Sequence, residues 1–214
     1  TIPFTEKDKF KIDQFIMRGG KVLWAIEGMN AEMDSLQGKD FFMAAEQDIN
    51  LTDQLFKYGA RINEDLIQDL QNTPISLVTG NVNGQPQMKN FPWLFNPILF
   101  GSDKHAIVKN IEPVKSTFVS TLDTIRVAGI KKTPLLTTSQ YSKAMMNPVR
   151  VFLGIIQEEP NPANFKQANL PVSYLLEGEF TSVFEGRLTK SYQEIMDTVK
   201  DLKFIEKGVP NKMI

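Results

Sequence analysis

Four polar residues of this chain follow apolar runs that read as buried strands. Glu27 and Asn30 come after one run, and Thr138 and Ser139 come after another. Open α/β sheets bind ligands at the carboxyl ends of parallel strands. If the two strands are parallel neighbours, the four side chains share one crevice rim, where they could hydrogen-bond a small molecule or a glycan. The alternative is that Thr138 and Ser139 cap a following helix and that Glu27 is a solvated loop acid.

The familiar catalytic motifs are incomplete in this sequence. Gly20 and Lys21 match the middle of a phosphate-binding P-loop, but Phe15 replaces its first glycine and Val22 its metal-binding hydroxyl. The chain has no cysteine, and its single histidine, His105, is not accompanied by a G-x-S-x-G elbow. We therefore expect no catalytic residues and interpret His105 as a loop or strand-edge residue. A hydrolase with unrecognised carboxylate catalysis is an alternative.

Metal and cofactor sites are also not indicated. One histidine and no cysteine do not suffice for a structural zinc site. The spacing of acidic residues contains no calcium-binding loop motif, and the pair Glu158 and Glu159 before Pro160 fits a solvated turn. The sequence therefore predicts neither a cofactor nor a metal. A Ca²⁺ or Mg²⁺ site made only of oxygen ligands is the alternative, since Asp and Glu are plentiful.

Composition narrows the class of protein further. The chain has 214 residues, of which 42% are hydrophobic, and this is enough to bury one sizeable core. We expect residues 1–214 to form a single α/β domain. The 24 basic and 25 acidic residues nearly cancel, unlike the basic surface of a nucleic-acid-binding protein. We expect no nucleic-acid partner.

Neither a transmembrane run nor an export signal is visible. No stretch of about 18 apolar residues occurs, and the start lacks the order of basic, apolar and small residues that a signal peptide has. The sequence begins at Thr1, and no strand precedes the first predicted helix. We expect the chain to be a soluble portion of a longer protein.

A change of hydrophobic period at a double glycine predicts a helix followed by a strand. Apolar residues before Gly19 recur at helical spacing, and Thr5 is a suitable N-cap with Asp8 in the first turn. Gly19 stands where the end of a helix needs a positive φ. The apolar run 22–26 is typical of a central strand that is covered on both faces.

Helical and extended segments alternate along the rest of the chain. A short helix from about residue 51 to Tyr58 leads into an extended segment at 60–62. Asn83-Gly84 is the strongest hairpin signal, and we expect a hairpin-rich insertion around residues 74–104. The other predicted elements are strands, apart from an amphipathic helix at 190–204, and they lie at 106–108, 114–120, 135–137 and 172–176.

Residues 91–100 contain more aromatic side chains and prolines than an ordinary solvated loop. Phe91, Trp93 and Phe95 alternate with other residues at the start of this segment. They could pack inward as a satellite core. They could instead present an apolar patch to a partner subunit or a membrane surface. Both interpretations remain open at this point.

Four sequence blocks follow one another along the chain: IDQFIMRGGKVLWAIEG, INLTDQLFKYGARINEDLIQD, TPLLTTSQYS and VSYLLEGEFTSVF. In this order they resemble the gliding-motility ABC transporter auxiliary proteins of Bacteroidetes-type bacteria. They are distributed over nearly the whole chain. The resemblance implies an α/β three-layer sandwich similar to class I glutamine amidotransferase-like folds and related to a domain of intraflagellar transport proteins.

The resemblance also implies a function and a location. Proteins of this family are grouped with the permease and ATPase of an ABC system, and hydrophobic helices near their ends flank a large extracytoplasmic domain. The chain would then lie at the periplasmic face of the inner membrane, anchored by segments outside it. There it would bind a substrate or couple a partner. Amidotransferases use a cysteine nucleophile, which this chain lacks, so no catalytic residue can be transferred.

Overall fold

The structure is a computed structural model that describes residues 2–188 and 203–214. This part of the chain is rich in strands and has two α-helices, α1 (Glu6–Met17) and α2 (Thr52–Tyr58). Three short 3₁₀ segments are η1 (Met33–Leu36), η2 (Leu153–Gln157) and η3 (Pro162–Asn164). The mixed α/β class is therefore confirmed, whereas the three-layer amidotransferase-like sandwich is not. The helix predicted at 190–204 lies almost entirely outside the described residues.

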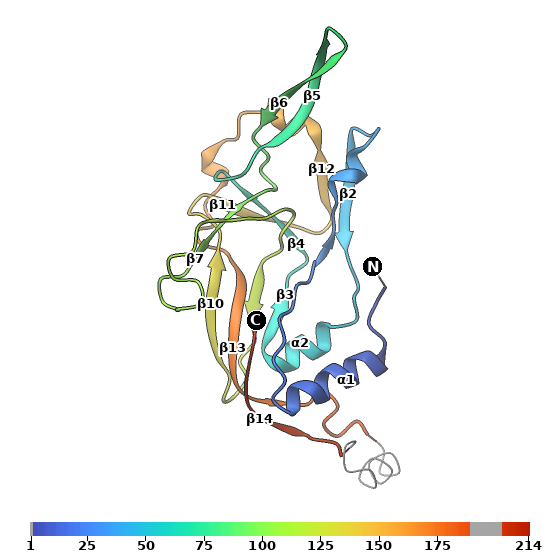
Figure 1. The fold of residues 1–214 in the computed structure, drawn as a ribbon, viewed down its shortest axis with the longest axis vertical. Helices are drawn as coiled ribbons and strands as arrows, with labels where there is room; N and C mark the ends of the chain where they lie inside the picture. The colour runs from blue at the N-terminus through green and yellow to red at the C-terminus, as the bar shows by residue number, and fades with distance from the viewer. Residues whose placement is uncertain (1, 189–202) are drawn as a thin grey trace.

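The strands form one large antiparallel sheet and several small ones (Figure 1). In spatial order, the large sheet contains β14 (Lys207–Met213), β13 (Pro171–Thr181), β10 (Lys131–Thr137), β7 (Ile98–Gly101) and β8 (Val114–Lys115). A three-stranded sheet contains β1 (Met29–Asn30), β2 (Phe41–Glu46) and β12 (Val149–Phe152). The remaining strands pair two by two, as β4 (Asp65–Asp69) with β11 (Ser142–Met146), β3 (Ala60–Ile62) with β9 (Leu122–Thr124), and β5 (Ile75–Val82) with β6 (Gln85–Phe91).

Helix α1 begins and ends as the sequence predicts. Thr5 is the N-cap, and its hydroxyl accepts a hydrogen bond from the backbone N–H of Asp8 at 3.2 Å in a capping box. Gly19 follows the helix with φ 89°, a conformation that glycine adopts without a Cβ clash. The inner face buries Ile16 and Met17 in a core cluster with side chains of β13 and β14. Local capping and burial of one face therefore define this helix.

The segment after Gly19 is not the buried central strand that we predicted. Val22 forms an isolated parallel bridge with Met213, and the backbone N–H of Trp24 donates to the carbonyl of Ile214 at 2.7 Å. Exposure alternates along residues 22–27, and Leu23 is 74% exposed. The run is thus an extended segment at the edge of the sheet with one face in solvent. A continuous apolar run alone does not distinguish such an edge from a central strand.

Several other predicted elements are confirmed, and two are wrong. Helix α2 ends at Gly59, with φ 105°, and leads into β3, while β10 and β13 contain the predicted strands 135–137 and 172–176. Residues 106–108 lie in a turn, and the strand predicted at 114–120 is only the two-residue β8. The single-domain organisation stays a prediction.

The predicted hairpin is formed by β5 and β6 and projects away from the rest of the molecule (Figure 1). Asn83 and Gly84 have φ values of 52° and 81°, as the two central residues of a type I′ turn require. The strands pair in register from Ile75 opposite Phe91 to Val82 opposite Gln85, with one irregularity after Val78. The dipeptide Asn83-Gly84 therefore predicted the hairpin that projects from the fold.

Candidate functional site

The structure does not bring the four polar residues of the predicted crevice together. Thr138 and Ser139 are 1% and 5% exposed. The backbone N–H and hydroxyl of Ser139 donate to the two carboxylate oxygens of buried Asp69 at 2.9 and 2.6 Å, and the hydroxyls of Thr138 and Ser142 are 2.7 Å apart. These groups tie the end of β10 to β4 and β11. They serve the fold, and no helix follows that they could cap.

Glu27 and Asn30 lie on a different, exposed segment. The prediction required parallel neighbouring strands, but β10 is antiparallel to both β7 and β13. Glu27 borders a groove of about 570 Å³ together with Gln47 and Ser120 among others, and neither Thr138 nor Ser139 lines it. The predicted crevice is therefore wrong as a four-residue site. Glu27 remains a candidate ligand contact in its own groove.

The predicted partner surface of Phe91, Trp93 and Phe95 also needs correction. Trp93 and Phe95 are both 0% exposed, with ring centroids 5.7 Å apart, and Phe95 packs in turn against Phe118. They belong to a core cluster with side chains of β2, β4 and β12. Only Phe91, at the base of the hairpin, is partly exposed. Its ring lies 5.3 Å from the Nζ atom of Lys89. The aromatic segment is therefore mainly core.

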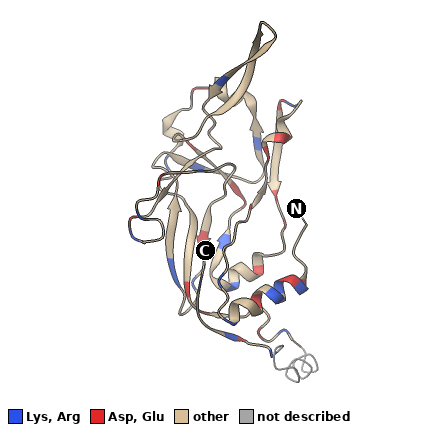
Figure 2. Cartoon of the chain, in the orientation of Figure 1, with Lys and Arg blue, Asp and Glu red and all other residues tan. Residues whose placement is uncertain are grey.

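The hairpin, unlike the aromatic segment, exposes apolar side chains. Val78 and Met88 lie directly opposite each other and are 62% and 59% exposed, and Val82 near the tip is 50% exposed. Lys89 is the only charged residue between Ile75 and Phe91, and the hairpin is almost free of charge in Figure 2. The irregularity after Val78 puts Val82, opposite Gln85, on the other face of the hairpin. We name the two side chains Val78 and Met88 the hairpin patch.

The hairpin lacks the usual protection of a sheet edge. Among the described residues, β5 and β6 pair only with each other, so both outer edges carry unpaired backbone groups. Natural edge strands are commonly protected by charges, and an isolated two-stranded hairpin is marginally stable in water. The near absence of charged residues from the two strands predicted around Asn83-Gly84 is the sequence feature that could have identified this surface.

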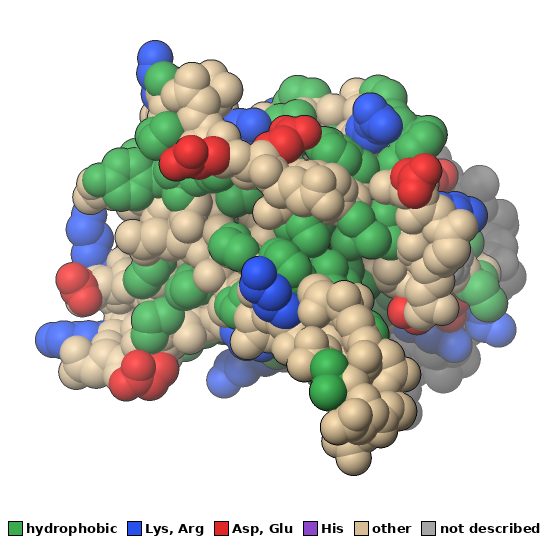
Figure 3. Space-filling view, turned by 90° about the horizontal axis from the view of Figure 1, so that it is seen from above, with side chains coloured by type: hydrophobic (Ala, Val, Ile, Leu, Met, Phe, Trp, Pro, Cys, Tyr) green, Lys and Arg blue, Asp and Glu red, His purple; other side chains and the backbone are tan. Residues whose placement is uncertain are grey.

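Hydrophobic side chains also approach the surface at the foot of the hairpin. Ile75, the first residue of β5, is part of a half-buried layer that covers the core cluster, as are Phe42, Met145 and Ile155. Seen from above, hydrophobic side chains gather over the middle of this end of the molecule (Figure 3). Ile75 lies three residues from Val78 in the regular part of β5, so it is on the other face of the hairpin, and this apolar region is separate from the hairpin patch.

A buried carboxylate holds the two helices and β13 together at the opposite end. Asp13 is 0% exposed, and its Oδ1 accepts hydrogen bonds from the hydroxyl of Tyr58 at 2.8 Å and the N–H of Val183 at 2.9 Å. Its Oδ2 accepts from Ser182 and Gln14. Burial and the neighbouring Asp13 carboxylate raise the pKa of Tyr58. Because each oxygen is satisfied and closed off from solvent, this network is structural.

An ion-pair cluster on α1 and α2 is more accessible. Lys9 Nζ lies 2.7 Å from Asp53 and 3.1 Å from Glu6, and Arg187 reaches the other oxygen of Asp53 at 3.1 Å. Burial opposes the ionisation of Asp53, but hydrogen bonds from Lys9 and Arg187 outweigh it and hold the pKa of Asp53 below its ordinary value. The hydrogen bond from Lys9 is the main cause that lowers the pKa of Glu6.

We expect the substitution Lys9→Met to make stability less dependent on acidic pH. A carboxyl group with a lowered folded-state pKa stabilises the fold above its unfolded pKa of about 4, and this contribution is lost as pH falls through the folded value. Both carboxyl groups are partly exposed, so the difference should be about 1 kcal/mol or less. Urea unfolding at pH 7 and pH 3 measures it, and an equal loss in both proteins would contradict the assignment.

The described residues offer no evident metal centre. Within residues 2–188 and 203–214, no group of three or more acidic or histidine side chains is placed to hold a metal ion. In the same part of the chain, no helix has both the length and the apolar character that crossing a membrane requires.

Comparison with known proteins gives one informative match. A family model described as ABC-type uncharacterized transport system matches residues 1–214, the whole of the chain. No curated protein shows a significant match. No solved structure shows a significant match either.

Proposed function

Since the chain belongs to the family of the ABC-type uncharacterized transport systems, we propose that it is an auxiliary component that couples partner subunits and does not catalyse a reaction. The family supports association with an ABC transport system. Within such a system, the domain would act by coupling partner subunits.

The observation that carries this proposal is the projecting hairpin. Its patch of Val78 and Met88 is exposed, and one lysine is the only charged residue of the hairpin. Exposed apolar surface is a common mark of protein docking sites, and uncharged strand edges favour pairing with another chain.

The partners in this proposal are the permease and ATPase subunits of the ABC system. The domain would lie on the periplasmic face of the inner membrane, anchored by segments outside this chain, and the system would be related to those linked to gliding motility. The sequence blocks described above support these finer assignments. The buried carboxylates Asp13 and Asp69 find their hydrogen-bond partners within the chain. This agrees with a domain that acts by contacting partner subunits.

The double substitution Val78→Asp/Met88→Asp should abolish copurification with the ABC subunits. Two carboxylates on the same face of the hairpin would have to be desolvated in the interface without partners, which costs several kcal/mol. An affinity tag on the protein, expressed in its native cells, allows the permease and ATPase to be identified and quantified by mass spectrometry.

The matched control is Ile2→Asp/Ile107→Asp, which changes two exposed isoleucines outside the hairpin to the same charge. This control should retain the ABC subunits at the level of the unmodified protein. If the hairpin variant retains them as well, while both proteins unfold at the same temperature, the hairpin is not the docking surface and the proposal fails.

A further inference from the structure

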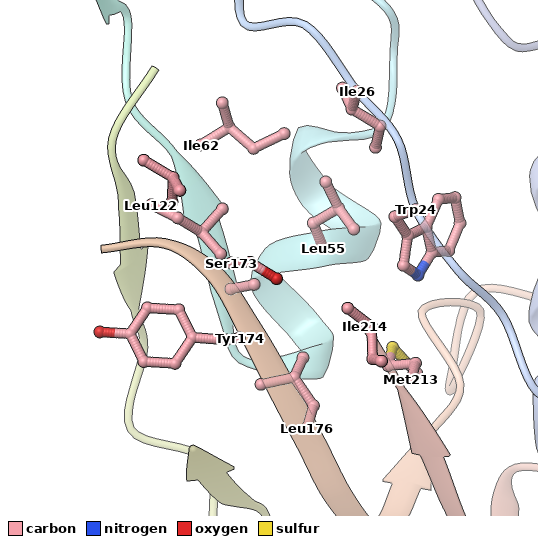
Figure 4. A pocket seen from close by; sticks show the side chains of 12 residues that line it. Trp24, Ile26, Leu55, Ile62, Leu122, Ser173, Tyr174, Leu176, Met213 and Ile214 are labelled. Carbon is pink, nitrogen blue, oxygen red and sulfur yellow. The ribbon is translucent and has the colours of Figure 1, made fainter. Parts of the chain in front are cut away.

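Two pockets of the described residues differ in the side chains that line them. The pocket in Figure 4, of about 100 Å³, lies beside Trp24 and has no charged side chain in its lining. The other pocket, of about 250 Å³, is lined by side chains of β4, β11 and the segment 155–165. Besides apolar groups, it contains one lysine, two glutamates and three amide side chains. We name it the Lys143 pocket, and its charged and amide groups suit a small ionic ligand.

The ammonium group of Lys143 has no carboxylate partner among the described residues. It takes part in none of the ion pairs of this part of the chain. Its Nζ atom lies 4.7 Å from the centre of the Phe165 ring. Partial burial lowers the pKa of Lys143, because the charged form loses hydration. An anionic group beside Nζ would compensate for this loss.

A buried amide stands next to this ammonium group. Gln68 of β4 lies directly opposite Lys143 of β11, so both side chains leave the same face of the strand pair. Gln68 is 4% exposed and lines the pocket, and its side-chain amide makes no hydrogen bond with a described residue. Buried amides are nearly always hydrogen-bonded. The Nζ of Lys143 and the Nε2 of Gln68 can both donate to one carboxylate of a ligand.

Two carboxylates line the same pocket from a different segment. Glu158 and Glu159 follow η2, and both are exposed. The sequence indicated a solvated turn for this pair, and the structure also places both side chains in the pocket lining. Within the described chain, neither forms an ion pair with Lys143 or with another residue. The pocket therefore offers a cationic group and anionic groups that do not neutralise each other by direct contact.

The apolar part of the pocket is held in place by backbone contacts. The N–H of Gln167 donates to the carbonyl of Ser142 at 3.0 Å, and this bridge ties the segment after η3 to β11. It thereby fixes Phe165, which is 4% exposed. Leu94, 8% exposed, and the half-buried Ile155 complete the apolar lining. A ligand with an aliphatic portion would be accommodated here.

We propose that the Lys143 pocket binds a small zwitterion, an α-amino acid with an aliphatic side chain. Its carboxylate accepts hydrogen bonds from Lys143 and Gln68, its ammonium group pairs with one of the two glutamates, and its side chain packs on the apolar lining. A neutral sugar would leave the charge of Lys143 unpaired, and an inorganic anion would leave the glutamates without a cation. The pocket is separate from the hairpin patch and does not depend on it.

Isothermal titration calorimetry of the purified chain with L-leucine tests this proposal, and we expect saturable binding. Lys143→Met should weaken binding about tenfold or more, because it removes a charged donor and keeps an unbranched side chain. Glu158→Gln/Glu159→Gln should weaken it by a similar factor. The matched control is Lys166→Met, which removes an exposed lysine outside the pocket lining and should bind within about twofold of the unmodified protein. Equal melting temperatures of the four proteins verify that all are folded.

Two analogues of leucine test the same proposal without any substitution in the protein. The amine 3-methylbutylamine lacks the carboxylate, and the acid 4-methylpentanoate lacks the ammonium group. Each should bind about tenfold more weakly than leucine or not at all. The proposal is overturned if leucine does not bind, if either analogue binds as tightly as leucine, or if Lys143→Met and Lys166→Met bind leucine equally well.

Discussion

Replacing Trp93 by alanine should lower the free energy of unfolding by about 3–5 kcal/mol. The side chain is 0% exposed and packs on Phe95, so its removal leaves a large cavity that the surrounding strands can fill only in part. Its Nε1 has no hydrogen-bond partner among the described residues, so the loss is one of packing. The change should therefore act on stability and leave partner binding of the folded protein intact.

Urea unfolding monitored by circular dichroism measures this loss, and Met88→Ala is the control. Met88 is 59% exposed on the hairpin, and its truncation should change stability by about 0.5 kcal/mol or less. If Trp93→Ala cost no more than this control and instead weakened copurification, the original interpretation of the aromatic segment as a partner surface would be restored.

The second large effect is expected at Asp13. The substitution Asp13→Ala removes the acceptor of the Tyr58 and Ser182 hydroxyls and of the Val183 N–H, and it leaves three buried donors without a partner. Each unsatisfied buried group costs about 1–3 kcal/mol, so we expect a total loss of about 3–5 kcal/mol after partial relaxation. The variant could lie near the limit of folding at ambient temperature.

Thermal unfolding of Asp13→Ala beside Asp103→Ala tests this expectation. Asp103 is an exposed acid in a turn, so its replacement removes the same charge without uncovering buried donors. The melting temperature should fall by about 6–20 °C for Asp13→Ala and by a few degrees at most for Asp103→Ala. Similar melting temperatures for the two variants would show that the network does not hold the helices to β13.

Local signals in the sequence were sufficient to predict the helix ends and the hairpin turn. The cap at Thr5, the glycines that end both helices and the turn at Asn83-Gly84 each act through a backbone preference of one or two residues. Such preferences do not depend on how distant strands pair. The mixed α/β class and the position of the hairpin followed from them.

Pairing between distant strands could not be predicted in the same way. The predicted crevice required the apolar run 22–26 and the strand 135–137 to be parallel neighbours. Instead, Met213 pairs with Val22 and Leu176, and β10 is antiparallel to its neighbours. Long-range pairing depends on which partner edge is free, and no residue signals this by itself. The Glu27–Thr138 crevice was wrong for this reason.

The burial of the aromatic segment also could not be predicted from the sequence. Phe91, Trp93 and Phe95 alternate like residues on one face of a strand, and this spacing suits a core and a docking patch equally well. Whether these rings are buried depends on Phe118, which comes from a later part of the chain and packs on Phe95. The exposed surface lies instead on the less conspicuous hairpin just before this segment.

Site-specific photocrosslinking from the hairpin is the most direct test of the proposed coupling role. A benzophenone amino acid at Val78, 62% exposed, should form an adduct that contains a subunit of the ABC system, whereas the same group at Ile107, 49% exposed, should not. The adducts are identified by mass spectrometry after irradiation of native cells. Adducts with ABC subunits at Ile107 and none at Val78 would contradict docking through the hairpin.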